Sequence, residues 1–195
     1  AYMMAKRGIK LTAVHFASPP YTSERAEEKV ISLLRQVGRY AGRMELHIVP
    51  FTHIQEEISR HCPEDLFTVV MRRFMMRLAE AVARQHDCEA LITGESVGQV
   101  ASQTIPAMAC TEAVTDLPVF RPLIGMDKEE IIAVARKIDT FEISIQPYED
   151  CCTVFTPRHP RTRPKLYMLE EAERALDVDA LVAEAMQGIR RVTID

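Results

Sequence analysis

Short apolar runs alternate with longer segments of helical periodicity along most of the chain, and this alternation constrains the fold strongly. The apolar runs predict strands at residues 10–15, 45–49, 89–93 and 118–121. The segments between and after them predict helices at residues 23–40, 53–61, 64–86, 98–110 and 128–138. Strands and helices in this order form a parallel sheet with helices on both faces. We therefore expect an α/β fold.

The two ends of the chain depart from this alternation. Residues 1–8 read as the last turns of a helix closed by Gly8, with no N-cap before them, so we expect the natural chain to begin further upstream. At the other end, a loop rich in proline and arginine at residues 156–165 precedes helices expected at 166–175 and 178–187. The regular alternation thus occupies the middle of the chain.

The composition is that of an ordinary globular protein. Hydrophobic residues make up 47% of the 195 positions and no run could span a membrane or act as a cleavable signal, so we expect a cytoplasmic protein. The five cysteines are too irregularly spaced for a disulfide scaffold. The net charge of -4 argues against a freestanding nucleic-acid binder, although residues 158–165 are locally basic. We expect one domain over residues 1–195, with the sheet in 1–147 and a cysteine loop and C-terminal helices in 148–195.

Small and polar residues follow the expected strands, at the edge where open parallel sheets bind their ligands. His15 and Phe16 end the first strand, Thr93–Ser96 follow the third, and Arg121 closes the fourth. Gly94 is either a turn glycine or a position where the backbone approaches a ligand closely, and the sequence favours neither reading. The string from Thr93 to Gln103 is more specific, because it is small and polar where a core crossover would be apolar.

Arg72 and His15 each allow two interpretations. Arg72 lies in an apolar helix with no acid three or four residues away, so its guanidinium meets either a phosphate or an acid from a neighbouring helix. The nearby Arg73 and Arg77 read instead as a solvated charged face. His15 is either a core histidine at a strand end or, with Phe16, part of the frame for a purine ring.

The cysteines fall into two groups. Cys62, Cys88 and Cys110 stand alone on regular elements and should pack as small apolar groups. Cys151 and Cys152 are adjacent in an expected loop, where they cannot chelate one metal well, so we expect no structural zinc there. They are either a nucleophilic or sulfur-carrying thiol with its neighbour, or a pair of packed loop cysteines.

Together, these strings resemble the tRNA 4-thiouridine synthetase family, which also supplies sulfur in thiamine thiazole synthesis. The matching segments are Ala13–Phe16 with Ser18–Pro20, Val70–Arg73, Thr93–Gln103, Arg121–Leu123 and Glu149–Cys152. The resemblance covers about residues 1–157 and weakens over the last helices.

The resemblance implies a PP-loop ATP pyrophosphatase fold of the adenine nucleotide alpha hydrolase type. It implies that ATP, with Mg²⁺ expected beside it, adenylates uridine O4 in tRNA, and that a cysteine desulfurase supplies the sulfur as a persulfide. The thiamine sulfur carrier protein is a further possible partner, and a homodimer is a possible assembly. The family's ATP-binding positions match His15, Phe16, Arg72, Gly94 and Gln103, and its catalytic cysteine matches Cys152.

The chain departs from the family pattern in what it lacks. The Ser-Gly-Gly-x-Asp-Ser loop and its central strand are absent from residues 1–195, and we expect them upstream together with ferredoxin-like and THUMP regions. There is no rhodanese domain, so the chain resembles the branch without one. Two rivals stay open: an amide-forming PP-loop ligase, which the paired cysteines disfavour, and a non-catalytic nucleotide- or sulfur-carrier-binding module.

Overall fold

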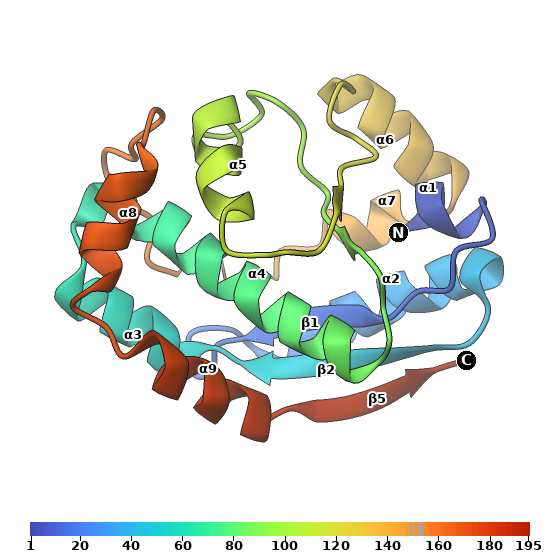
Figure 1. Ribbon diagram of the computed structural model, residues 1–195. Coiled ribbons are helices and arrows are strands. Elements are labelled where there is room, and N and C mark those ends of the chain that lie inside the picture. The colour runs from blue at the N-terminus through green and yellow to red at the C-terminus, as the bar shows by residue number, and fades with distance from the viewer. Residues whose placement is uncertain (149, 152–153) are drawn as a thin grey trace.

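The computed structural model describes residues 1–148, 150–151 and 154–195, with helices on both faces of its larger sheet (Figure 1). The strands are β1 (Ala13–Ala17), β2 (Met44–Pro50), β3 (Leu91–Ile92), β4 (Val119–Phe120) and β5 (Arg190–Ile194). The helices are α1 (Tyr2–Ala5), α2 (Glu24–Ala41), α3 (Thr52–His61), the short 3₁₀ helix η1 (Glu64–Leu66), α4 (Phe67–Gln85), α5 (Ile105–Glu112), α6 (Lys128–Lys137), α7 (Phe141–Ser144), α8 (Leu166–Glu173) and α9 (Val178–Gln187).

The strands form two separate sheets. One has the order β1-β2-β5, in which β1 and β2 are parallel and β5 runs antiparallel along the outer edge of β2 (Figure 1). The other consists of β3 and β4, which are parallel. The expected α/β class with helices on both faces is confirmed, and the four expected strands pair in parallel. The antiparallel β5 is a fifth strand that the sequence pattern did not predict. The antiparallel β5 escaped the sequence pattern because two arginines begin it, and such a short, charged segment becomes a strand through its pairing with β2.

The two faces of the larger sheet contact different helices. Val14 and Phe16 of β1 pack into a core built with α3, α4, α8 and α9, whereas Ala13 and Ala17 pack towards α1 and α2. Successive side chains of a strand point to opposite faces, which produces this division. His15 therefore lies on the α2 side of β1, and its neighbour Phe16 lies on the α4 side.

A groove of about 1230 Å³ separates the two sheets. Val14 and Phe16 of β1 line one side of it, and Leu91 and Ile92 of β3 line the other, with Arg72 of α4 also in the lining. Within the described part of the chain, β1 pairs only with β2, and β3 pairs only with β4. The strand edges that border this groove thus have no strand partner among the described residues.

Two local predictions had different outcomes. Gly8 closes α1 as expected, with a φ of 81° and an N–H that donates to the carbonyl of Ala5 at 2.8 Å. The helix expected at 98–110 is wrong in its first half, because α5 begins only at Ile105. The Thr104 hydroxyl caps this helix by accepting the N–H of Ala107 at 3.3 Å, and Pro106 occupies the first turn, where its missing N–H costs nothing.

In the described parts of the chain, no helix is both long and apolar enough to cross a membrane.

Candidate functional site

Glu95 lies in the loop after β3, is only 3% exposed, and binds two arginines from different elements. Its Oε1 accepts a hydrogen bond from Nη2 of Arg72 on α4. Its Oε2 accepts from Nε of Arg121, just past β4, at 2.7 Å and from the Thr93 hydroxyl at 2.8 Å. Arg121 also donates to Glu112 at 2.7 Å. This edge cluster of Arg72, Glu95 and Arg121 ties α4 to the carboxyl ends of β3 and β4.

The edge cluster leaves hydrogen-bond donors unused. Nε of Arg72 and Nη2 of Arg121 are buried, and neither has a partner among the described residues. Buried guanidinium donors are almost always bonded, so two unused donors in one cluster favour an anion as their partner. The sequence left two partners open for Arg72, a phosphate or an acid from a neighbouring helix. An acid does bind it, but from a loop, and its Nε remains available to a phosphate.

Gly94 precedes Glu95, and no contact or turn conformation among the described residues requires glycine there. Its φ lies outside the positive range, so the turn does not require glycine. A Cβ atom added there would meet no heavy atom of the described residues within 4 Å. A positive φ and packing against the described residues are therefore excluded as reasons, and this supports the alternative of close approach by a ligand.

Gln103 organises the loop between β3 and α5. Its side-chain oxygen accepts the N–H of Ser96 at 3.2 Å, and its backbone carbonyl accepts the N–H of Gly98 at 2.9 Å. Gly98 has a φ of 75°, which a side chain would strain. Gln103 thus shapes the loop that presents Gly94 and Glu95, and a direct contact with ATP remains a prediction.

His15 and Phe16 point to opposite faces of β1. Phe16 lines the groove together with Arg72, and its ring centroid lies 5.1 Å from that of Phe51. His15 is half-buried near Lys29 and Asp150, and burial lowers its pKa although the Asp150 carboxylate opposes this shift. Of the predicted ATP-binding residues, the groove thus brings Phe16 and Arg72 together, while His15, Gly94 and Gln103 lie outside its lining.

Cys152 lies outside the described residues, but the chain just before it is firmly held. The buried amide of Gln55 on α3 donates to the carbonyl of Cys151 at 2.7 Å, and the Ser18 hydroxyl donates to the other end of Gln55 at 2.5 Å. Lys29 of α2, which is 7% exposed, donates to the carbonyl of Tyr148 at 2.6 Å. These bonds hold the segment that leads to Cys152 beside the carboxyl end of β1.

The same anchoring reaches α4 and the chain beyond Cys152. The amide of Gln55 also lies 3.5 Å from Sδ of Met71, the residue before Arg72. On the far side of the cysteines, the Phe155 ring packs against Tyr21 and Phe67, with centroid distances of 5.1 and 5.6 Å. The cysteine segment and the edge cluster are therefore attached to adjacent residues of one helix.

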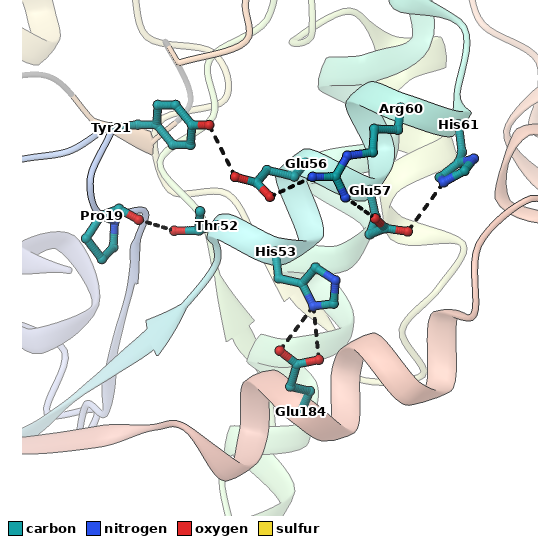
Figure 2. A network of polar contacts seen from close by, with 9 residues as sticks. All are labelled: Pro19, Tyr21, Thr52, His53, Glu56, Glu57, Arg60, His61 and Glu184. Carbon is teal, nitrogen blue, oxygen red and sulfur yellow. Dashed lines mark hydrogen bonds and ion pairs between the residues drawn. The ribbon is translucent and has the colours of Figure 1, made fainter.

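A polar network on α3 fixes the turn that contains Ser18. The Thr52 hydroxyl donates to the carbonyl of Pro19 at 2.7 Å, and Tyr21 donates to Glu56 at 3.2 Å (Figure 2). Sequence reasoning missed the roles of Ser18, Lys29 and Gln55. A signal existed for Gln55, a polar residue between Ile54 and Ile58 on the apolar face of its helix.

The remaining cysteines pack as the sequence predicts. Cys110 is buried in the main core, Cys62 packs against it, and Cys88 packs between α4 and the smaller sheet. Burial raises the pKa of the Cys62 thiol to about 11, with a further contribution from Glu173, and burial also raises the pKa of Cys110. Both groups are therefore protonated at neutral pH and are poor nucleophiles.

The expectation of a solvated face at Arg73 and Arg77 is wrong. Arg73 is 3% exposed and donates through Nε and Nη2 to both carboxylate oxygens of Glu173, at 2.7 and 2.9 Å. Its Nη1 donates to the carbonyl of Cys110 at 2.7 Å. Arg77 binds Glu173 through its two terminal nitrogens, at 2.9 and 2.7 Å. The acid comes from α8, far along the chain, which a local helical pattern does not reveal.

The basic loop at 158–165 is exposed but not wholly available. Arg161 donates to the Asp65 carboxylate at 2.7 Å, and its own N–H binds the carbonyl of Asp65 at 2.9 Å. Arg158, Arg163 and Lys165 are exposed and form no ion pair with the described residues. A phosphate backbone would therefore meet these three cations more readily than Arg161.

Comparison with known proteins agrees with this arrangement. A "Probable tRNA sulfurtransferase" of Acetivibrio thermocellus is 55% identical over 193 residues, which are 99% of this chain and 49% of that protein. Another of the same description from Moorella thermoacetica is 52% identical over 194 residues, covering 100% of this chain and 50% of that protein. The chain thus spans about half the length of the curated relatives it matches.

A solved structure described as a 4-thiouridine synthetase–RNA complex with bound ATP superposes with a TM-score of 0.95 at 41% identity, covering 100% of this chain and 51% of that one. This match confirms the expected fold over the whole chain. The family described as Thiamine biosynthesis protein (ThiI) matches residues 1–178, which include the edge cluster and the cysteine segment. The chain therefore belongs to the thiamine biosynthesis protein (ThiI) family.

Proposed function

We propose that this chain is the ATP-binding and sulfur-transfer part of a tRNA 4-thiouridine synthetase. The proposal rests mainly on the edge cluster, in which two buried guanidinium nitrogens have no hydrogen-bond partner among the described residues. The anchored cysteine segment is attached to the same helix through Gln55 and Met71. The solved relative, which contains ATP and RNA, supports the same conclusion. We place this soluble enzyme in the cytoplasm, where tRNA, ATP and a persulfide donor are present together.

The edge cluster serves as a phosphate site in this proposal. Nε of Arg72 and Nη2 of Arg121 donate to phosphate oxygens, and Glu95 holds both guanidinium groups in place. The missing side chain of Gly94 lets the nucleotide approach the backbone, and Phe16 offers an aromatic wall. His15 and Gln103 complete the set that the family resemblance implies, and Mg²⁺ accompanies the phosphates.

Sulfur transfer then follows from activation of the uridine. Uridine O4 attacks the α-phosphate of ATP and pyrophosphate leaves, which turns a poor leaving oxygen into AMP. The terminal sulfur of a persulfide, brought by a cysteine desulfurase, attacks C4, the C4–O bond breaks and AMP leaves. A thiol then attacks the cysteine sulfur of the resulting S–S bond, which releases 4-thiouridine and leaves a disulfide that a thiol reductant returns to free thiols. Cys152 is the essential thiol that supplies or resolves this sulfur. Lys29 and Gln55 anchor the segment that precedes Cys152 through the carbonyls of Tyr148 and Cys151.

The natural full-length protein with tRNA, ATP and a desulfurase tests this assignment. Cys152→Ser should abolish 4-thiouridine formation while ATP-dependent adenylation of the tRNA persists. Cys151→Ser should keep at least part of the activity, and Cys62→Ser is the matched control because that thiol is protonated and packed. Activity in both loop variants would exclude covalent sulfur chemistry there. Absence of ATP binding in the wild-type protein would favour a non-catalytic module instead.

We propose that the exposed cations of the basic loop contact tRNA phosphates. Arg158→Gln with Arg163→Gln should lower tRNA affinity and flatten its dependence on salt, because fewer counterions are released on binding. Arg39→Gln is a suitable control, since it removes an equally exposed arginine that is paired with Asp139 on another surface. An unaltered salt slope in the double variant would refute the contact.

We also propose that a PP-loop segment from outside residues 1–195 lies in the groove between β1 and β3. An extended segment parallel to β1 would satisfy both strand edges and would end at the carboxyl edge, where Arg72 lies. In the full-length protein, Asp→Asn in a Ser-Gly-Gly-x-Asp-Ser segment should then weaken ATP binding. Delivery of sulfur to the thiamine sulfur carrier protein is a second candidate function, which the description of the matching family favours.

A further inference from the structure

Two histidines and a glutamate converge at the end of β2 opposite to the edge cluster. Glu45 and His47 lie near the amino end of β2, and His86 directly follows α4. Each of the three offers one ligand atom, and these atoms all lie within 4.8 Å of one another. Since β1 and β2 are parallel, this cluster and the carboxyl-end site occupy opposite ends of the sheet.

The polar atoms of this cluster have few other partners. Oε2 of Glu45 lies 3.7 Å from Nε2 of His47 and 3.9 Å from Nδ1 of His86, beyond hydrogen-bond distance. The two imidazole rings pack with centroids 4.4 Å apart. The His47 side chain is 1% exposed, and Nε2 of both histidines is buried without a hydrogen-bond partner among the described residues. A ligand bound to Nε2 of His47 would remove the cost of burying that nitrogen unpaired.

Two imidazoles and one carboxylate form a common donor set for zinc. Ligand bonds of about 2.0–2.1 Å place tetrahedral donor atoms roughly 3.3 Å apart. The two distances from Glu45, 3.7 and 3.9 Å, would therefore shorten by roughly half an ångström. The third distance, which is within 4.8 Å, would shorten by at most about 1.5 Å. We propose that Glu45, His47 and His86 bind one Zn²⁺ ion. Glu45 and His86 also line the groove, so water or a group in the groove can take the fourth position.

Charged side chains around the three proposed zinc ligands include both cations, which oppose metal binding, and carboxylates, which favour it. Arg191 of β5 is the strand partner of His47, and Arg43 lines the same end of the groove, so both oppose a cation. The carboxylates of Asp87 and Glu89 line that end as well and favour one. A carboxylate within the donor set and two more beside it offset the two arginines.

Zinc at this position would join the start of β2 to the end of α4. The same helix carries Arg72 near its other end, so the ion would fix the register of α4 against the sheet on which the carboxyl-end site is built. Binding to the folded state alone should also raise its stability by mass action.

The test uses the natural full-length protein, stripped with a chelator and titrated with Zn²⁺ in a calorimeter and in thermal unfolding. One saturable site per chain and a rise in Tm are expected. Glu45→Gln, a change at a half-exposed side chain that should not impair folding, should weaken zinc binding at least about tenfold, the lower end of what even an outer partner contributes. His86→Gln should do the same, and X-ray absorption should report nitrogen and oxygen ligands.

His53→Gln is the matched control. His53 forms an exposed pair with Glu184 at 3.0 Å (Figure 2). It belongs to no group of three metal-ligand side chains among the described residues. This variant should bind zinc as the wild type does. Unchanged zinc affinity in both Glu45→Gln and His86→Gln would overturn the proposal, and so would a spectrum showing only sulfur ligands, since the ion would then sit on cysteines.

Discussion

Arg72 and Arg73 are neighbours on α4, and each belongs to a cluster of two arginines and one glutamate. The two clusters differ in how many of their guanidinium nitrogens form hydrogen bonds. The core cluster consists of Arg73, Arg77 and Glu173, and its members use four hydrogen bonds between guanidinium and carboxylate groups. The edge cluster also places a carboxylate between two arginines, but it leaves two buried nitrogens unbonded.

This difference separates a structural role from a binding role. Glu173 and Arg73 are buried between α4 and α8, and no buried nitrogen of Arg73 or Arg77 lacks a hydrogen-bond partner among the described residues. Arg72 lines the groove between the two sheets, and its Nε has no hydrogen-bond partner among the described residues. Burial is similar in the two clusters, so the unused donors are the feature on which the proposed ligand site at the edge cluster rests.

The largest expected effect lies in the core cluster. Glu173→Gln keeps the shape of the side chain but leaves the buried Arg73 and the partly exposed Arg77 without a counter-charge. We expect the free energy of unfolding to fall by about 3–5 kcal/mol, measured by urea denaturation. ATP affinity of the remaining folded protein should not change. A loss below about 1 kcal/mol would mean that the core cluster is no more structural than a surface pair.

The converse change in the edge cluster should affect binding instead of stability. Arg72→Met should weaken ATP binding by about 2 kcal/mol, because a charge-assisted bond to phosphate is lost. Glu95 keeps Arg121 and Thr93, so stability should change little. Calorimetric titration of the full-length protein measures the first effect. Arg84→Met, on the exposed face of the same helix, is the control, and equal ATP affinity in the two variants would contradict the assignment.

Gly94 offers a smaller and sharper test of the same distinction. Gly94→Ala should leave stability unchanged or raise it by up to about 1 kcal/mol, because its φ is compatible with alanine and the space around it is open. ATP affinity should nevertheless fall if a nucleotide approaches this backbone. Gly98→Ala is the matched contrast: its φ of 75° predicts a stability loss of roughly 1 kcal/mol. Unaltered ATP affinity in the Gly94→Ala protein would show that no nucleotide approaches this backbone and that Gly94 is an ordinary turn residue.

The smallest expected effect is a pH dependence confined to the core cluster. Burial alone would raise the pKa of Glu173, but hydrogen bonds from Arg77 and Arg73 outweigh it and hold the pKa below its usual 4.5. A carboxylate with a depressed pKa contributes stability that is complete above pH 4.5 and is lost as the pH falls through the folded-state pKa. The stability difference between wild type and Glu173→Gln should therefore be constant above pH 4.5 and shrink below it. A constant difference down to acid pH would show that the charge does not matter.

Local patterns in the sequence determined much of the fold and the identity of several site residues. The period of the apolar residues predicts β1, α2, β2 and α4 to within a few residues, because strand and helix faces repeat at fixed intervals. Positive φ at Gly8 and the packing of the single cysteines are also local consequences of residue type. These features depend on neighbours a few positions away along the chain.

Only the tertiary structure decided which arginine faces the groove and which supports the core. One residue along a helix is a rotation of about 100°, which turns Arg72 towards the groove and Arg73 towards α8. Their acids lie 23 and 100 residues further along the chain, and no local period encodes such distances. The anchoring of the cysteine segment by Lys29 and Gln55, 119 and 96 residues from their acceptors, has the same origin. Hydrogen-bond partners of buried polar groups are chosen by how distant elements pack, and the sequence states only that such groups require partners.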